Sequence, residues 1–430
     1  MSIWQWAAVL VLAVLNALDG FDVLSISFAS PGISHDWGID NRTLGWVLST
    51  ELMGMAVGSV LLGNVADRKG RRPVILGCLI AMAIGMFGAA QAANVEMLLL
   101  SRLVTGLGIG GALAAINAAV AEMSNNRWRS LAMALFVIGY PLGGVLGGLI
   151  VKHLLASGTW RDVFMAGAAA TALFIPLVWW LVPESVAFLE RSRATDALLR
   201  INRILVHFRH SAISALPGAD ERSDKRSVMD LFRPGLIATT VLMTFAYFAH
   251  MTSFYFILKW VPKIIVDLGF AQTAAAGVLL WVNVGGATGC VIFGLLAVRA
   301  GLKRLTLVTL IGSCAMIIVF GRGATDIAGL TTRIALAGSF ANATVVGLYS
   351  LFATVFPTHV RASGTGFAVG VGRGGAVVAP VMAGYLFQAG FSLQTVTTLM
   401  AMGSLAAAVA LLLHTQPADL DLSYSPSPGL

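Results

Sequence analysis

The chain has 430 residues, of which 57% are hydrophobic and 11% are charged, and its mean hydropathy is +0.85. An ordinary soluble domain is about 45–50% apolar and about 25% charged, so this composition excludes a soluble protein. The formal charge of +8 comes from Lys and Arg residues that gather between long apolar stretches, which indicates membrane topology and gives no reason to invoke nucleic acid.

Apolar stretches of about 20 residues, the length that crosses a bilayer as a helix, recur along nearly the whole chain. A transmembrane barrel would need segments of about 10 residues with alternating polarity, and Val9–Leu18 does not alternate. The first stretch starts close to Met1 without a basic segment or a cleavage site, so we expect it to remain as a helix and not to be a signal peptide. The predicted spans are 5–30, 43–64, 73–92, 97–123, 130–154, 161–182, 234–260, 273–297, 305–321, 329–355, 363–389 and 393–413.

The first predicted span carries a polar stripe. Four polar residues recur every three positions and share one face of an apolar helix: Asn16, Asp19, Asp22 and Ser25. A charge near the bilayer centre costs about 2.5–3.5 kcal/mol, so ionisable residues within spans are candidate functional groups. We expect the stripe to face a wet central cavity, with Asp19 and Asp22 as proton sites. The alternative is that both carboxyls only hydrogen-bond to neighbouring helices.

Among the charged residues within the predicted spans of the first half, three more are candidate functional groups: Glu51, Arg102 and Glu122. Counted from the outer helix ends, Arg102 and Asp22 differ in depth by about several ångströms, so we expect them to pair. An Asp beside an Arg stays ionised, whereas an Asp deprived of that partner in an apolar cavity binds a proton near neutral pH. This contact is therefore a way to load and release a proton. Glu51 has two possible roles at this point, as part of a gate or as part of the proton path.

A polar segment over residues 183–233 separates six predicted spans from six. Shifting the first half by 231 positions places Pro31 on Pro262 and Arg102 on Arg333. These matches indicate internal duplication, a parallel repeat of the kind that transporters use, with the substrate site between the halves. The predicted organisation is a first half over 1–182, a cytoplasmic linker over 183–233, a second half over 234–413 and a cytoplasmic tail over 414–430.

Glycines spaced by four recur in helices related by the repeat, for example Gly54 and Gly58 with Gly285 and Gly289. This spacing puts small residues on one helix face and allows close backbone contact. We interpret these faces as surfaces for gating movements, with static helix packing as the alternative.

The distribution of Lys and Arg predicts the orientation of the chain. One set of predicted loops carries 19 of the 28 Lys and Arg residues and the opposite set carries six, including Lys259 and Lys263. Because basic loops stay in the cytoplasm, we expect both termini to be cytoplasmic.

The core of the second half offers two basic residues, Arg373 and His250. Arg373 has no acidic partner in its own half, and an uncompensated guanidinium fits a carboxylate, which it can bind through two parallel hydrogen bonds. His250 is open between ligand contact and a structural hydrogen bond. Tyr247 and Trp281 are candidates for contact with an aromatic ring, although simple packing would also explain them.

Several motifs resemble signatures of the major facilitator superfamily. They are Gly63-Asn-Val-Ala-Asp67-Arg68-Lys-Gly70-Arg71-Arg72, Arg102-Leu-Val-Thr-Gly106-Leu-Gly108 and Pro183-Glu184-Ser185. Within that superfamily, Asp19-Gly20-Phe21-Asp22 is similar to the Asp-Gly-x-Asp motif of aromatic acid:proton symporters. A second segment also resembles that family, namely Pro357-Thr-His-Val-Arg361-Ala-Ser-Gly364-Thr-Gly366 running into Gly372-Arg373-x-Gly375. The resemblance covers residues 3–413. It implies an all-α membrane protein with twelve transmembrane helices in two six-helix pseudo-symmetric halves, the major facilitator fold.

The same resemblance implies a cytoplasmic gate. We expect this gate to contain Asp67, Arg68, Arg72 and Glu122, all near the inner helix ends of the first half. The second copy of the signature loop departs from the pattern, because Val298 stands where the first copy has Asp67. The second gate therefore lacks the usual acid.

The combined prediction is a proton-coupled importer of an aromatic carboxylate, acting as a monomer in the bacterial inner membrane, with no metal and no cofactor besides the coupling proton. A proton-driven exporter or a sugar-type carrier stays open, because Tyr140-Pro141-Leu-Gly143-Gly144 partly resembles a drug-antiporter motif. A membrane enzyme or receptor is disfavoured, since no nucleophile–base pair or sizeable soluble domain is visible. The assigned residues are Asp19, Asp22, Arg102 and Glu51 for proton coupling and Arg373, His250, Tyr247 and Trp281 for substrate binding.

Overall fold

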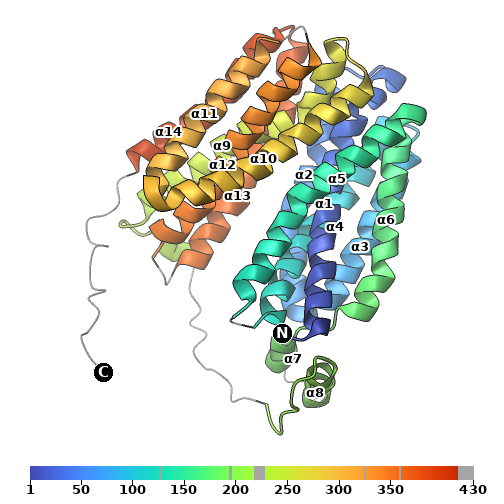
Figure 1. Cartoon of the computed structure of the whole chain (residues 1–430), viewed down its shortest axis with the longest axis vertical. Helices are drawn as coiled ribbons and strands as arrows, with labels where there is room; N and C mark the ends of the chain where they lie inside the picture. The colour runs from blue at the N-terminus through green and yellow to red at the C-terminus, as the bar shows by residue number, and fades with distance from the viewer. Residues whose placement is uncertain (126, 193–195, 217–227, 324–325, 358–359, 415–430) are drawn as a thin grey trace.

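The computed structural model describes the chain except for residues 126, 193–195, 217–227, 324–325, 358–359 and 415–430 (Figure 1). Within the described residues, 12 helices are long and apolar enough to cross a membrane. The first six are α1 (Ile3–Trp37), α2 (Asn41–Lys69), α3 (Arg71–Ala90), α4 (Val95–Met123), α5 (Arg129–Ser157) and α6 (Trp160–Leu181). The last six are α9 (Ile237–Asp267), α10 (Gln272–Ala300), α11 (Leu302–Gly321), α12 (Ile327–Val355), α13 (Arg361–Gln388) and α14 (Leu393–Leu413).

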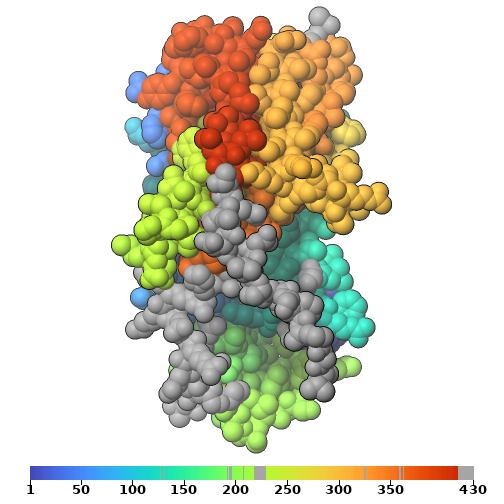
Figure 2. Space-filling view, turned by 90° about the vertical axis from the view of Figure 1, so that its left-hand side faces the viewer, coloured from blue at the N-terminus to red at the C-terminus, as the bar shows by residue number. Residues whose placement is uncertain are grey.

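The predicted linker contains three short elements, which are α7 (Val186–Ser192), α8 (Ala197–His207) and the 3-10 helix η1 (Val228–Phe232). Both α7 and α8 project beyond the helix ends on the side where α1 begins, as Figure 1 and the green segment at the bottom of Figure 2 show. We call this side the linker end and the opposite side the far end. Except for His414, the predicted tail lies outside the described residues.

Several helices are longer than their predicted spans. The difference matters most for α9, which continues from the predicted end at residue 260 to Asp267 and stays helical through Pro262. A proline can sit inside a membrane helix when neighbouring groups satisfy the carbonyl it leaves free. The extension places Lys259 inside a buried helix, so the prediction of this lysine as a loop residue is wrong.

The repeat-related glycines allow close helix contacts within each half. A Cβ atom added to Gly54 would lie 2.5 Å from the carbonyl oxygen of Leu103 on α4. Gly285 of α10 meets the backbone of Ala335 on α12 in the same way. These glycine faces therefore hold each half together in this conformation and do not lie between the halves, which favours the packing alternative over gating.

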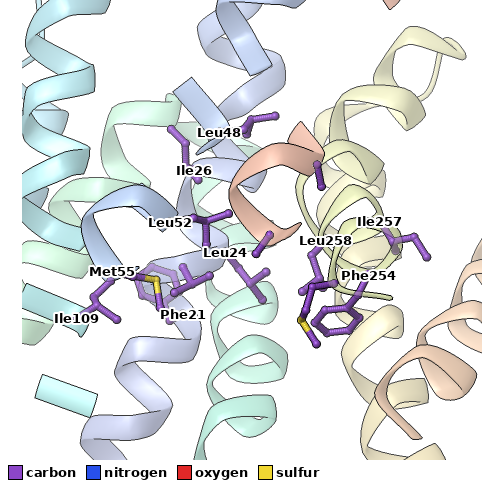
Figure 3. Close-up of a cluster of buried hydrophobic side chains, with 14 of the residues drawn as sticks. Phe21, Leu24, Ile26, Leu48, Leu52, Met55, Ile109, Phe254, Ile257 and Leu258 are labelled. Carbon is purple, nitrogen blue, oxygen red and sulfur yellow. The ribbon is translucent and has the colours of Figure 1, made fainter. Parts of the chain in front are cut away.

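The two halves contact each other toward the far end. Ser49 of α2 donates a hydrogen bond to the carbonyl of Val377 on α13, 2.5 Å away, and Asn41 N donates to Gln388 Oε1 at 3.2 Å. In the close-up of Figure 3, Leu24 of α1 faces Leu258 of α9 within one apolar cluster. The halves are thus sealed by apolar and backbone contacts at this level of the bundle.

Toward the linker end the helices of the two halves diverge (Figure 1). Among the described residues, nothing lies within 4 Å of a Cβ atom built on Gly366 or Gly370 of α13, or on Gly294 of α10. On the first half, a groove of about 330 Å³ between α2 and α4 is lined by Ser59, Asp67 and their neighbours, all from that half. This conformation is therefore closed at the far end and open at the linker end.

Candidate functional site

A buried ionic cluster lies where α1, α2, α4 and α9 meet. Arg102 of α4 is fully buried and forms an ion pair with the carboxylate of Glu51 on α2. Its guanidinium also donates to the backbone carbonyl of Asp22 at 3.1 Å and lies 5.2 Å from the ring centroid of Phe164. Burying a charge is costly unless partners compensate it, so these contacts account for a guanidinium inside the membrane.

The second cation of this cluster comes from the other half of the protein. Lys259 of α9 is fully buried and donates to the backbone carbonyl of Val23 on α1 at 2.5 Å. Its ammonium nitrogen also lies 3.4 Å from Glu51 Oε2. Glu51 therefore joins one cation from each half, and the Lys259 contact bridges the two halves.

Asp19 and Asp22 are buried beside this cluster, but their carboxylates are poorly partnered. Both carboxylate oxygens of Asp22 and one of Asp19 have no hydrogen-bond partner among the described residues. The structure thus differs from the expected Asp22–Arg102 ion pair, because Arg102 contacts only the backbone of Asp22 and gives its ion pair to Glu51. An unpaired buried carboxylate is tolerated far better with a proton than with a charge.

Arg373 lies near the middle of α13 and is only partly buried. Its position on the helix is close to those of Gly366 and Gly370, whose surroundings are open, so it shares their face. The described residues include no ion-pair partner for Arg373. The guanidinium is close enough to act electrostatically on three tyrosine hydroxyls, those of Tyr140, Tyr247 and Tyr255.

These tyrosines join the two halves around Arg373. Tyr140 belongs to α5 of the first half, and its hydroxyl is close enough to act on that of Tyr255 on α9 of the second. Tyr247 packs its ring on Gly372, next to Arg373, and its hydroxyl lies 3.3 Å from that of Tyr349. The arrangement combines an unpaired guanidinium with aromatic faces and hydroxyl groups, which suits an anion that carries a flat apolar part.

Two other predicted binding residues lie apart from this group. His250 is fully buried, and its ring nitrogens contact Ser404 Oγ at 3.1 Å and the carbonyl of Ala341 at 3.0 Å. Of the two alternatives for His250, this conformation therefore shows structural hydrogen bonds within the second half. Trp281 is 49% exposed and lies on the face of α10 away from Leu280 and Asn283, which contact the first half. The structure does not bring Trp281 to Arg373.

The predicted gate residues gather at the linker end, with Arg71 at their centre. Arg71 contacts Asp67 at 2.5 Å and Glu122 at 3.3 Å, while Arg68 is exposed and has no ion-pair partner among the described residues. Arg72 turns the other way, donates to the carbonyl of Trp179 and lies over its ring. The gate prediction thus assigned contacts to Arg68 and Arg72 that this conformation gives to Arg71.

The structure adds functional candidates that the sequence analysis missed. For Lys259, the available signal was a lysine within an apolar run, which the charge count placed among the loop residues. For Arg71, several basic residues follow one another, and only the turn at Gly70 decides which of them points inward. For Tyr140 and Tyr255, no signal in the sequence links two residues on different halves.

Comparisons with known proteins identify similar transporters. A gallate transporter of Pseudomonas putida is 27% identical over 413 residues, which cover 96% of this chain and 92% of the relative. A 4-hydroxybenzoate transporter of Pseudomonas putida is 29% identical over 402 residues, covering 93% and 90%. A bacterial homologue of the human lysosomal transporter Spinster, solved in an inward-facing and unoccupied conformation, has a similar fold with a TM-score of 0.73 at 16% identity, covering 96% of this chain and 95% of that structure.

The family model of the Major Facilitator Superfamily matches residues 12–326, most of the chain. Together with the twelve-helix fold and the near full-length similarity to aromatic acid transporters, this match identifies a carrier and excludes an enzyme. The chain therefore belongs to the Major Facilitator Superfamily.

Proposed function

We propose that this protein imports an aromatic carboxylate together with a proton, by alternating access between its two halves. The observation that carries the proposal is Arg373, a partly exposed guanidinium without an ion-pair partner among the described residues, on the open face of α13. A carboxylate is the anion that a planar guanidinium binds through two parallel hydrogen bonds. The gallate and 4-hydroxybenzoate transporters among the relatives support an aromatic acid as the substrate.

The ring of the substrate would lie among the tyrosines beside Arg373. Tyr140 and Tyr255 come from different halves, so a ligand that touches both tyrosines contacts both halves at once. Such a site can couple binding to movement, because a rocking motion of the halves changes the distance between its two walls. Tyrosine faces also favour edge or offset contact with an aromatic ring.

Asp19 and Asp22 are the proposed proton sites. Their unpartnered carboxylates support this role, since a proton removes the cost of a buried charge. Glu51, Arg102 and Lys259 compensate one another only in part, because two cations face one carboxylate. Moving Lys259 away from Glu51 when the far end opens would remove a positive charge from this cluster, so its carboxyls would bind a proton more readily, which suits proton loading from outside the cell.

The orientation rests on the charge distribution of the loops. The linker end carries most of the Lys and Arg residues, so we place it in the cytoplasm of a bacterial cell, with both termini there. The conformation described above is then open to the cytoplasm and corresponds to the state that releases substrate into the cell.

Uptake into proteoliposomes tests the proposal. Purified protein with an imposed inward proton gradient is expected to concentrate at least one acid from a panel of benzoate, hydroxybenzoates, protocatechuate, vanillate and gentisate. An uncoupler should abolish accumulation of the acid inside the liposomes but leave exchange of the acid across the membrane. If no acid is taken up, or if an outward gradient drives export alone, the proposal is wrong.

A further inference from the structure

A second pocket lies at the linker end, on the outside of the first half. Its volume is about 310 Å³, and it is formed by the start of α3, the end of α6, the turn that follows α6, and α7 and α8. The residues that give it its character are Arg72, Arg200, Arg203, Trp179, Trp180 and Glu184. None of these residues belongs to the buried cluster or to the group around Arg373.

Three guanidinium groups line this pocket, and those of Arg200 and Arg203 keep most of their hydrogen-bonding capacity free, while Arg72 also donates to the carbonyl of Trp179. Arg203 has no ion-pair partner among the described residues, and Arg200 has only an exposed contact of 3.7 Å with Asp196. Such exposed pairs are weak. The Nε atom of Arg72 is buried and has no hydrogen-bond partner among the described residues. The pocket therefore offers donors for an anion.

The one carboxylate in the pocket wall is already occupied. Glu184 Oε1 accepts hydrogen bonds from the backbone N–H groups of Arg71 at 2.8 Å, Arg72 at 3.3 Å and Ser185 at 2.9 Å. Glu184 thereby caps the beginning of α3, where the helix dipole favours a negative charge. Its charge is compensated there, and the lining keeps a net positive charge.

The surroundings indicate where such an anion comes from. Trp179 and Trp180 at the end of α6 are 58% and 80% exposed, and tryptophan at a helix end is typical of the membrane–water interface. On α8, Leu199 and Val206 are exposed on the same face as Arg203, so apolar and basic side chains lie together on this surface. The pocket thus combines basic groups with residues that contact lipid.

We infer that this pocket binds the phosphate headgroup of an anionic phospholipid, held by Arg200, Arg203 and Arg72 and flanked by Trp179. Basic pockets on the cytoplasmic side of membrane proteins bind acidic lipid headgroups, and the linker end is that side in the orientation on which the proposed function rests. A bound lipid would hold α8 against the first half, since Arg200 and Arg203 belong to α8 whereas Arg72 belongs to α3.

The test is native mass spectrometry of delipidated full-length protein titrated with phosphatidylglycerol or with phosphatidylcholine of the same chains. Wild type is expected to prefer phosphatidylglycerol. The double variant Arg200→Gln/Arg203→Gln should bind it roughly 30-fold more weakly, because each basic residue near a membrane surface contributes about fivefold. The double variant Arg129→Gln/Arg304→Gln removes two exposed charges at the same end outside the pocket and should bind like wild type.

Three results would overturn the inference. The first is equal affinity for the two lipids in wild type, and the second is an equal loss in both double variants, which would reflect overall charge alone. The third is displacement of phosphatidylglycerol by excess inorganic phosphate, which would indicate a site for a soluble anion. Thermal unfolding in detergent shows whether the variants are folded, and both are expected to match wild type because the replaced side chains are exposed.

Discussion

Lys259 of α9 and Glu51 of α2 form a buried ion pair between the two halves, with 3.4 Å between the ammonium nitrogen and Oε2. The same carboxylate also pairs with Arg102 of its own half. For the far end to open, α9 must move away from α1 and α2, and this movement separates Lys259 from both Glu51 and the Val23 carbonyl. We therefore expect this pair to act as a latch that favours the conformation closed at the far end.

Replacing Lys259 by Met should shift the protein toward conformations open at the far end. A hydrogen bond to a charged group contributes about 1.5–3 kcal/mol, so the equilibrium should change by roughly 10- to 150-fold. Distances between spin labels at Ala156 and Ala271, at the far ends of α5 and α10, measure the shift. Lys263→Met is the matched control, because Lys263 pairs with Asp267 within α9. Unchanged distances in Lys259→Met would contradict the latch.

Replacing Asp22 by Asn should abolish proton-driven accumulation and leave substrate exchange. The Asn side chain has nearly the shape of a protonated Asp but cannot exchange a proton. Uptake with a proton gradient and counterflow without one distinguish the two activities. If Asp22→Asn still concentrates substrate as wild type does, Asp22 is not a proton site.

Asp40→Asn is the control for this experiment. Hydrogen bonds from Thr43 hold the pKa of the Asp40 carboxyl below its usual range, so Asp40 stays ionised near neutral pH and carries no proton during transport. Asp40 caps α2 through Thr43 N at 2.8 Å, and Asn caps helices about equally well. Normal accumulation is therefore expected in this variant.

Replacing Arg373 by Lys or by Ala should weaken binding of the aromatic acid. Losing a charge-assisted two-point contact in a partly dehydrated site costs about 2–4 kcal/mol, or roughly 30- to 1,000-fold in affinity, with Ala worse than Lys. Calorimetry with purified protein measures this loss. Trp281→Ala, at an exposed position away from Arg373, should bind like wild type.

The uncharged amide of the same acid separates an anchor from a conformational role. If Arg373 binds the carboxylate, wild type should bind the amide much more weakly than the acid. Equal binding of the acid and the amide would show that the guanidinium does not hold the carboxylate. Wild-type affinity in both Arg373 variants would lead to the same conclusion.

Replacing Asp67 by Asn should lower turnover more than substrate affinity. Asp67 lines the groove between α2 and α4 at the linker end, far along α2 from Glu51, and its side chain is 59% exposed in the present conformation. When the linker end closes, the second half must approach this groove, so the loss falls on a conformational step. A contact of about 1 kcal/mol corresponds to roughly fivefold in kcat.

Transport kinetics in proteoliposomes check this prediction, with KM expected to stay near its wild-type value. Asp196→Asn is a matched control, because Asp196 is also 59% exposed and forms a similar pair with Arg200 one turn along α8. A rise in KM with unchanged kcat would place Asp67 in the binding step and refute the gate.

The helices and the candidate charges could be predicted from the sequence because their causes are local. A run of apolar residues needs no knowledge of its neighbours to be recognised as a span, and a charge inside such a run is conspicuous because of its cost. Asp19, Asp22, Glu51, Arg102 and Arg373 were all found in this way. The duplication was visible for the same reason, since it is a property of the chain order.

The partners of those charges were decided only by the tertiary structure. The sequence predicted a pair of Arg102 with Asp22, but the packing of α2 against α4 gives Arg102 the carboxylate of Glu51 and leaves that of Asp22 unpartnered. Lys259 was one more lysine near a helix end until the contact of α9 with α1 and α2 buried it beside Glu51. Hydropathy determines that a helix crosses the membrane, but its rotation about its own axis and its neighbours determine which charges meet.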